Sequence, residues 1–189
     1  MKKVLLINGS PRPMNNSQKM LNIFAEAAKK FGIETEIINL EKMNLGMCKG
    51  CLACFKTNKC FQKDGLNELV AKMEEADGIV VASPVYYGSV TAQMKTFMDR
   101  SGLLGEAHGR SFRSKLAGSI TVARRWGHLG AQTDMMLWMD RTEMVHVGCG
   151  WCSATSTNDN DISSDEEGLQ YPVRLAENFA RIWNLEEMK

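Results

Sequence analysis

The segment Val4-Leu5-Leu6-Ile7-Asn8-Gly9-Ser10-Pro11-Arg12 joins a short apolar run to a polar turn. Four consecutive apolar residues are too few for a helix and are typical of a strand buried on both faces. Gly78-Ile79-Val80-Val81-Ala82-Ser83, followed by Pro84, repeats this arrangement. Because strands of this kind occur in parallel sheets covered by helices, the two segments predict an α/β protein.

The rest of the chain alternates between strand and helix patterns. We expect five strands, at Val4–Ile7, Glu34–Asn39, Gly78–Ser83, Leu116–Val122 and Met144–Val147. We expect helices at about Asn16–Phe31, Gly65–Ala76, Thr91–Arg100, Gly127–Asp140 and Tyr171–Glu187, and a polar, acidic loop from about Ser153 to Gly168. This alternation favours a doubly wound, five-stranded parallel sheet in the order 2-1-3-4-5, in a single domain over residues 1–189.

Composition excludes several classes of protein. The 189 residues suffice for one substantial core, and the net charge of +1 gives no reason to expect a nucleic-acid partner. Met1-Lys2-Lys3 leads directly into the first strand, so we expect no signal peptide, and no apolar run has the length of a membrane span. Clustered cysteines without a secretion signal indicate a reducing compartment, so we expect a cytoplasmic protein.

Four of the six cysteines lie in the loop at residues 47–60, with the spacing C-x2-C-x2-C-x5-C. Runs of this kind hold ferredoxin-type iron–sulfur clusters. The loop therefore predicts a 4Fe-4S cluster bound by Cys48, Cys51, Cys54 and Cys60. A zinc site and four free thiols are the alternatives, although zinc is more often bound by two C-x2-C pairs set apart.

The turn from Gly9 to Ser17 follows the first strand at the edge where parallel sheets bind ligands. It has neither the G-x4-G-K-[ST] nor the G-x-G-x-x-G pattern. It does offer the hydroxyls of Ser10 and Ser17, the Arg12 guanidinium and the free N–H groups of the following helix, which suit a phosphate. The alternative is that the two serines only satisfy the turn and the cap, since Asn16 or Ser17 can cap the helix.

Two groups of motifs together resemble a known family. They are Gly9-Ser10-Pro11-Arg12 with Asn16-Ser17, and Ser83-Pro84-Val85-Tyr86-Tyr87-Gly88 with Lys95 and Phe97-Met98-Asp99-Arg100. The chain, from the first strand to about Trp151, resembles the flavodoxin-like NAD(P)H-dependent FMN reductase superfamily. With its compact cysteine motif, it resembles the iron–sulfur flavoprotein branch.

The resemblance implies that the chain binds FMN. The residues it assigns to the phosphate are Ser10, Arg12, Asn16 and Ser17, and those it assigns to the isoalloxazine ring are Pro84, Val85, Tyr86, Tyr87 and Gly88. An aromatic wall and backbone donors suit such a ring, and the alternative for both tyrosines is ordinary packing at a strand end. Arg124 or Arg125 can stabilise a reduced, anionic flavin, or be a solvated surface pair.

Cys149 and Cys152 form a second C-x2-C pair. In the order 2-1-3-4-5, strands two and five lie at opposite edges, roughly 19 Å apart, so a metal shared with the loop at 47–60 is not expected. The pair is either redox-inert or close to a neighbouring subunit's flavin. The apolar run at residues 135–139 exceeds one helix face, so we expect a homodimer or homotetramer in which Trp126 or Trp138 loses exposure on assembly.

The sequence thus predicts a flavin-dependent oxidoreductase that transfers electrons between FMN, a 4Fe-4S cluster and an external carrier. No acid–base constellation is evident, so we predict no catalytic side chain. The resemblance implies ferredoxin or NAD(P)H as the donor. One alternative is an NAD(P)H-dependent FMN or quinone reductase without a cluster. Another is a zinc-stabilised binding module without catalysis.

Overall fold

The computed structural model describes residues 1–13, 15–156 and 161–188. Its strands are β1 (Lys3–Asn8), β2 (Glu34–Asn39), β3 (Gly78–Pro84), β4 (Leu116–Ala123), β5 (Val145–His146) and β6 (Ser153–Thr155). Its α-helices are α1 (Asn16–Lys29), α2 (Cys54–Thr57), α3 (Leu66–Glu75), α4 (Ala92–Ala107), α5 (His128–Arg141) and α6 (Glu166–Ile182), and a 3-10 turn covers Leu40–Lys42. No helix in these ranges is long and apolar enough to cross a membrane.

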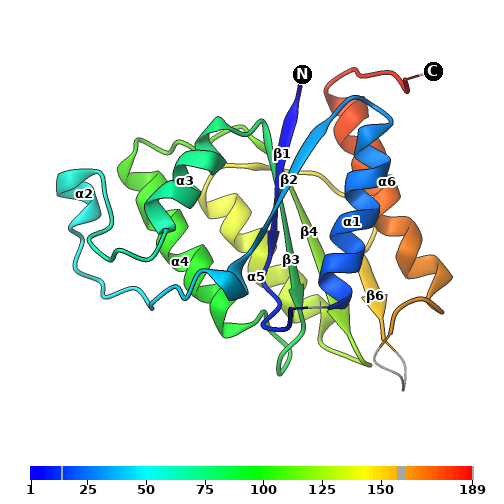
Figure 1. The fold of residues 1–189 in the computed structure, drawn as a ribbon, viewed down its shortest axis with the longest axis horizontal. Helices are drawn as coiled ribbons and strands as arrows, with labels where there is room; N and C mark the ends of the chain where they lie inside the picture. The colour runs from blue at the N-terminus through cyan, green and yellow to red at the C-terminus, as the bar shows by residue number, and fades with distance from the viewer. Residues whose placement is uncertain (14, 157–160, 189) are drawn as a thin grey trace.

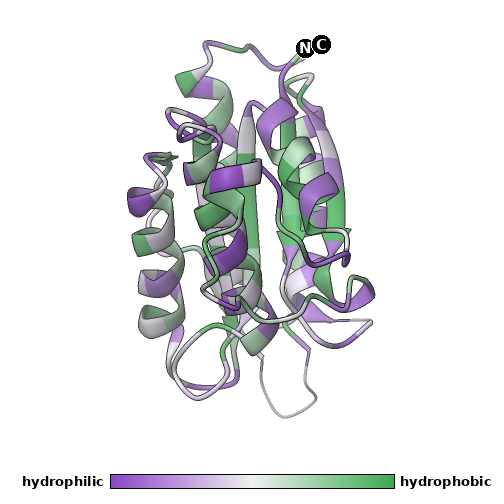
Figure 2. Cartoon of the chain, turned by 90° about the vertical axis from the view of Figure 1, so that its left-hand side faces the viewer, coloured by the Kyte–Doolittle hydropathy of each residue, from purple (hydrophilic) through white to green (hydrophobic). Residues whose placement is uncertain are grey.

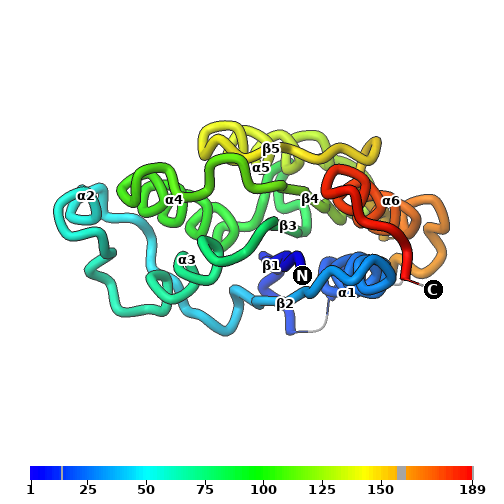
Figure 3. The backbone as a smooth tube through the Cα atoms, turned by 90° about the horizontal axis from the view of Figure 1, so that it is seen from above, coloured from blue at the N-terminus to red at the C-terminus, as the bar shows by residue number. Residues whose placement is uncertain are grey.

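The strands form one parallel sheet in the order β2-β1-β3-β4-β5, as the sequence predicts. Figures 1 and 3 show the sheet between two helical layers, with α1 and α6 on one face and α3, α4 and α5 on the other. In Figure 2 the strands are mostly hydrophobic, whereas the helices carry both hydrophobic and hydrophilic residues. Each helix therefore turns an apolar stripe towards the sheet.

Side chains of the central strands alternate between two cores. Leu5 and Ile7 of β1 face the core under α3, α4 and α5, whereas Val4 and Leu6 face the core under α1 and α6. All four are fully buried, which explains why β1 reads as a continuous apolar run. The carboxyl ends of β1, β3 and β4 meet at one edge of the sheet, at the bottom in Figure 1.

Several predicted boundaries were wrong. The acidic segment after Trp151 is not all loop, because β6 pairs with β4 there, and three residues are too few to give a strand pattern. Helix α4 continues past Arg100 to Ala107, and its Leu104 is buried in the core. Helix α6 begins at Glu166, because the Asp165 side chain accepts a hydrogen bond from the Gly168 N–H and caps it.

Candidate functional site

The turn after β1 is held by side-chain hydrogen bonds. The Ser10 N–H donates to Asn8 Oδ1 at 3.1 Å, and the Ser10 hydroxyl accepts from the Arg12 N–H at 3.3 Å. The cap of α1 is Asn15, whose Oδ1 accepts from the Gln18 N–H at 2.8 Å. The prediction that Asn16 or Ser17 caps this helix was therefore wrong. Asn15 has the extended backbone that an N-cap needs, whereas Asn16 is already the first helical residue.

The Ser17 hydroxyl takes no part in these hydrogen bonds. Ser17 is buried, and its Oγ has no hydrogen-bond partner among the described residues. A buried hydroxyl without a partner costs free energy unless a ligand or water satisfies it. Arg12 is exposed on the same turn, and α1 presents its N-terminal N–H groups there. The turn thus has the donors that a phosphate requires.

The loop after β3 and the loop after β4 pack against each other. The Val85 N–H donates to the Val122 carbonyl at 2.8 Å, and Gly88 lies so close to α5 that a Cβ added at Gly130 would stand 1.9 Å from the Gly88 oxygen. Tyr87, at φ 50°, is fully exposed, and Trp126 is 68% exposed. Two unshielded aromatic side chains beside backbone donors suit a flat ring ligand.

A buried hydroxyl connects these loops to the turn after β1. Thr91 caps α4, and its Oγ1 also donates to the Gly9 carbonyl at 2.6 Å. The Gly9 N–H donates to the Ala82 carbonyl at 2.8 Å. The predicted residues of all three loops therefore lie along one edge of the sheet. Arg124 is exposed at the end of β4, and His128 begins α5 and contacts the Ala154 carbonyl at 3.3 Å, an ordinary structural bond.

The four cysteines of the loop at 47–60 line one common hollow. Cys48 and Cys51 are exposed, and Cys54 and Cys60 are half-buried against the core. In the described part of the chain, no three His, Cys, Asp or Glu side chains are placed to hold a metal ion. A 4Fe-4S cluster does not need its sulfurs to meet at one ion, because its cysteines bind different irons. Four thiols around one hollow fit that donor set.

Arg100, buried at 3% exposure, closes this loop from the side of α4. Its guanidinium donates to the Gly46 carbonyl at 2.9 Å, to both carboxylate oxygens of Asp64 and to Cys60 Sγ at 3.0 Å. Asp64 also accepts from the Gly46 N–H at 3.0 Å. Burial alone would raise the pKa of Asp64, but the hydrogen bond from Arg100 holds this pKa below its usual value. Arg100 thus joins residues on both sides of the cysteines.

A second residue of α4, its C-cap His108, also contacts the cysteine loop. His108 contacts Glu74 at 2.6 Å through Nδ1 and the Asn58 carbonyl at 2.8 Å through Nε2. Burial alone would lower the pKa of His108, but the hydrogen bond with Glu74 and that with Asn58 raise it above its usual value. No motif in the sequence indicates this role of His108. Arg100 belongs to the segment Phe97-Met98-Asp99-Arg100 of the family resemblance, but its contact with the cysteine loop was not predicted.

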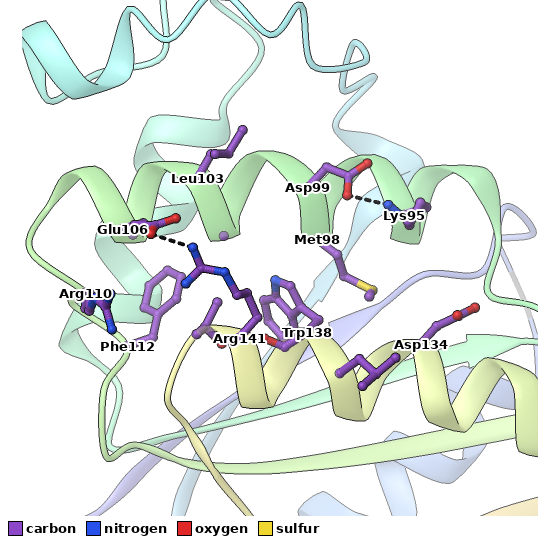
Figure 4. Close-up of a pocket in the computed structure, with 14 residues that line it drawn as sticks. Lys95, Met98, Asp99, Leu103, Glu106, Arg110, Phe112, Asp134, Trp138 and Arg141 are labelled. Carbon is purple, nitrogen blue, oxygen red and sulfur yellow. Dashed lines mark hydrogen bonds and ion pairs between the residues drawn. The ribbon is translucent and has the colours of Figure 1, made fainter.

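A hollow of about 410 Å³ lies between α4 and α5, outside the three-loop edge (Figure 4). Trp138 lines it but is only 8% exposed, because its ring packs against Phe97 at 5.6 Å between centroids. Trp138 therefore has little exposure to lose, and Trp126 is the tryptophan on which the assembly prediction depends. Of the apolar run at 135–139, Met136 and Leu137 remain exposed, at 38% and 62%.

The sheet order and the loops clustered at its carboxyl edge define a flavodoxin-like α/β protein. The family model described as "NADPH-dependent FMN reductase" matches residues 2–159, so the chain belongs to that family. An iron–sulfur flavoprotein of Methanocaldococcus jannaschii is 43% identical over 97% of this chain and 98% of its own, which places the chain in the iron–sulfur flavoprotein group.

Two further comparisons support the family and the fold. An iron–sulfur flavoprotein of Archaeoglobus fulgidus is 37% identical over 74% of this chain but only 61% of its own length. The crystal structure of a flavodoxin, WrbA-like protein from Agrobacterium tumefaciens has a TM-score of 0.63 at 18% identity, over 96% of this chain and 99% of that one. At that identity the likeness shows the fold alone.

Proposed function

We propose that residues 1–189 act as one FMN-binding domain that transfers electrons between FMN, a 4Fe-4S cluster and an external carrier. The observation that supports this proposal is that two separate groups of side chains suited to ligands lie at different places in the fold. The carboxyl-end loops contain a buried, unpartnered Ser17 hydroxyl beside exposed Arg12. The loop at 47–60 arranges four thiols around one hollow beside a buried arginine.

In the flavin site, Ser10, Arg12, Asn16 and Ser17 would bind the FMN phosphate. The segment Pro84, Val85, Tyr86, Tyr87 and Gly88 would line the isoalloxazine, and Arg124 would favour its reduced, anionic form. Bound FMN supplies exchange between two-electron and one-electron carriers. The chain's contribution is to bind and orient the ring through backbone donors, and to exclude water from one of its faces.

In the cluster site, Cys48, Cys51, Cys54 and Cys60 would bind the irons as thiolates. Arg100 already donates to Cys60 Sγ, and a hydrogen bond of this kind fixes the orientation of a ligating sulfur. A residue of α4 would thus hold the Cys60 side chain in its ligating orientation. The three lysines of the loop, Lys49, Lys56 and Lys59, add positive charge around it.

The two sites lie along α4, whose first residue adjoins the flavin loops. Arg100 is eight residues beyond Ala92, which is roughly 12 Å along a helix axis. Figure 1 shows α2, within the cysteine loop, far from the carboxyl ends of the strands. We therefore propose a homodimer or homotetramer that brings the cluster of one subunit towards the flavin of another. Exposed Trp126, Leu129 and Leu137 are the apolar side chains available for this contact.

We propose the external electron carrier as a chemical class. NAD(P)H or ferredoxin would supply electrons, and quinones or other carriers would accept them. All six cysteines are free, which agrees with a reducing compartment such as the cytoplasm. An FMN or quinone reductase without a cluster keeps the flavin site but needs no metal in the cysteine loop. A zinc-stabilised binding module needs no flavin.

One preparation tests all three functions. Protein purified without oxygen should contain FMN with about four iron and four sulfide per chain, and a broad visible absorption from the cluster. Cys51→Ser should lose that absorption and keep FMN, whereas Cys149→Ser, a matched control outside the loop, should keep both. FMN without iron would favour the reductase without a cluster. Zinc without FMN would favour the binding module, and either result would contradict the proposal.

A further inference from the structure

Strands β5 and β6 are two parts of one edge strand, interrupted by a bulge. Ala117 pairs with His146 and Thr121 pairs with Ser153, so four residue steps on β4 face seven steps on its neighbour. Between these two pairs, the edge strand therefore contains three residues more than β4. The Thr121 N–H donates to the Cys152 carbonyl at 3.0 Å, and the Gly148 carbonyl accepts from Asn178 Nδ2 at 2.7 Å. Because both its ends are fixed, the bulge presents its side chains in defined directions.

This bulge contains the second C-x2-C pair, which the flavin and cluster sites do not use. Cys149 is half-buried at its tip, beside Gly150 at φ 91°. Cys152 is only 2% exposed, in the core under α1 and α6. Cys149 packs against that same core cluster, and only two residues separate it from Cys152. A half-exposed thiol and a buried thiol at this C-x2-C spacing are suited to form a disulfide.

The two thiols differ in acidity. The hydrogen bond from Cys152, with the positive charge of Arg174, lowers the pKa of Cys149 despite its partial burial. Burial and the neighbouring Cys149 raise the pKa of Cys152 well above its usual value. Cys149 is thus the thiol that reaches the nucleophilic thiolate form first, and Cys152 stays protonated behind it.

An open hollow of about 400 Å³ lies over Cys149, between the bulge and α6. Its lining includes two guanidinium groups and one carboxylate, from Arg174, Arg181 and Glu177, together with Asn178. Arg174 also lies over the Tyr171 ring, 5.6 Å from its centroid, which holds the guanidinium near the bulge. The hollow therefore carries a net positive charge and suits a ligand with carboxylate groups.

We propose that Cys149 and Cys152 are a second redox centre, a dithiol that exchanges with low-molecular-weight disulfides bearing carboxylates. The Cys149 thiolate attacks one sulfur of the ligand, the ligand S–S bond breaks, and one thiolate leaves. Cys152 then attacks Cys149 Sγ, its proton passes to solvent or to the leaving group, and the second ligand thiol departs. In sum, two protein thiols become one disulfide, and one ligand disulfide becomes two thiols.

Oxidised glutathione and cystamine are suitable probes, because the first carries carboxylates and the second is cationic. Anaerobic holoprotein is mixed with each, and peptide mapping by mass spectrometry follows the products. Oxidised glutathione should give a Cys149–Cys152 disulfide about tenfold faster than cystamine. In Cys152→Ala, which keeps a small apolar side chain in the core, the glutathione adduct on Cys149 should persist, because no thiol remains to resolve it.

Arg174→Gln should slow the reaction of oxidised glutathione about fivefold and leave that of cystamine unchanged or faster. Arg141→Gln, a matched change of an exposed arginine on α5, should alter neither rate. Failure to form the Cys149–Cys152 disulfide in folded protein with an intact cysteine loop would overturn the proposal. Equal rates for the two probes, unaffected by Arg174→Gln, would overturn the assignment of the hollow to carboxylates. Flavin and iron content do not enter either readout.

Discussion

Replacing Arg100 by methionine tests whether a buried ion pair closes the cysteine loop. Methionine has a similar length and suits the apolar neighbourhood of α4, so the packing of the helix should survive. The change removes every hydrogen bond that the guanidinium makes to Gly46, Asp64 and Cys60. It leaves the Asp64 carboxylate, only 14% exposed, with the Gly46 N–H but without a cation.

The expected loss follows from burial. Removing one partner of a buried ion pair costs about 3–5 kcal/mol, because the other charge is left uncompensated. The side chains of Arg100 and Asp64 are 1% and 14% exposed, so water can reach the carboxylate in part. We therefore expect the lower end, about 3 kcal/mol of unfolding free energy. For a chain of this length that corresponds to a Tm lower by about 6–12 °C.

Urea unfolding of Arg100→Met, Asp64→Asn and the double variant, followed by tryptophan fluorescence, measures the loss and the coupling. The coupling free energy between the two sites should be about 2 kcal/mol. Lys95→Met is the matched control on the same helix, since its pair with Asp99 is exposed and should be worth less than about 0.5 kcal/mol. A loss below about 1 kcal/mol for Arg100→Met, or additive single effects, would refute the reasoning.

Four other predictions concern single sites. Ser17→Ala should leave the stability of the flavin-free protein unchanged or higher, because its hydroxyl is unpartnered, but should weaken FMN about tenfold in a fluorescence titration. Arg12→Ala should weaken FMN more than riboflavin, which has no phosphate; equal losses would remove Arg12 from the phosphate site. The contribution of His108 to the free energy of unfolding should be complete below its unfolded pKa and be lost as pH rises through its raised folded pKa. Unfolding measured across that pH range should show a weaker pH dependence of stability in Glu74→Gln. Trp126 fluorescence should shift to the blue on assembly at micromolar concentration, and a purely monomeric sedimentation profile with full FMN occupancy would contradict the proposed oligomer.

Continuous apolar runs made the fold predictable from the sequence. Val4–Ile7 and Gly78–Ser83 read as strands buried on both faces, and they occupy the centre of the sheet. The alternation of elements then left few possible strand orders. The edge of the sheet beside β4 was harder to predict, because β5 has two residues and β6 has three. Neither strand is long enough to show a hydrophobic periodicity. The residues predicted for the flavin site lie along one edge because their loops each follow a strand.

Contacts between distant residues could not be predicted in the same way. The spacing of the cysteines was visible in the sequence, but nothing in residues 47–60 indicates that Arg100 donates to Cys60. The surplus apolar residues at 135–139 suggested a subunit contact, yet Trp138 is buried by Phe97, which belongs to α4. A side chain's partner across the fold depends on packing that local patterns do not encode.

Helix α4 connects the two proposed redox sites through buried polar residues. Thr91, at its N-terminus, donates to Gly9 of the phosphate turn, and Arg100, two turns later, holds Asp64 and Cys60 of the cysteine loop. Both side chains are buried and hydrogen-bonded to the loops, so these contacts fix the helix relative to both loops. A rigid helix also fixes the separation of the two sites. The proposed assembly would bring the cluster of one subunit closer to the flavin of another, so we expect assembly and the rate of electron transfer to fall together when the exposed apolar surface near Trp126 is made polar.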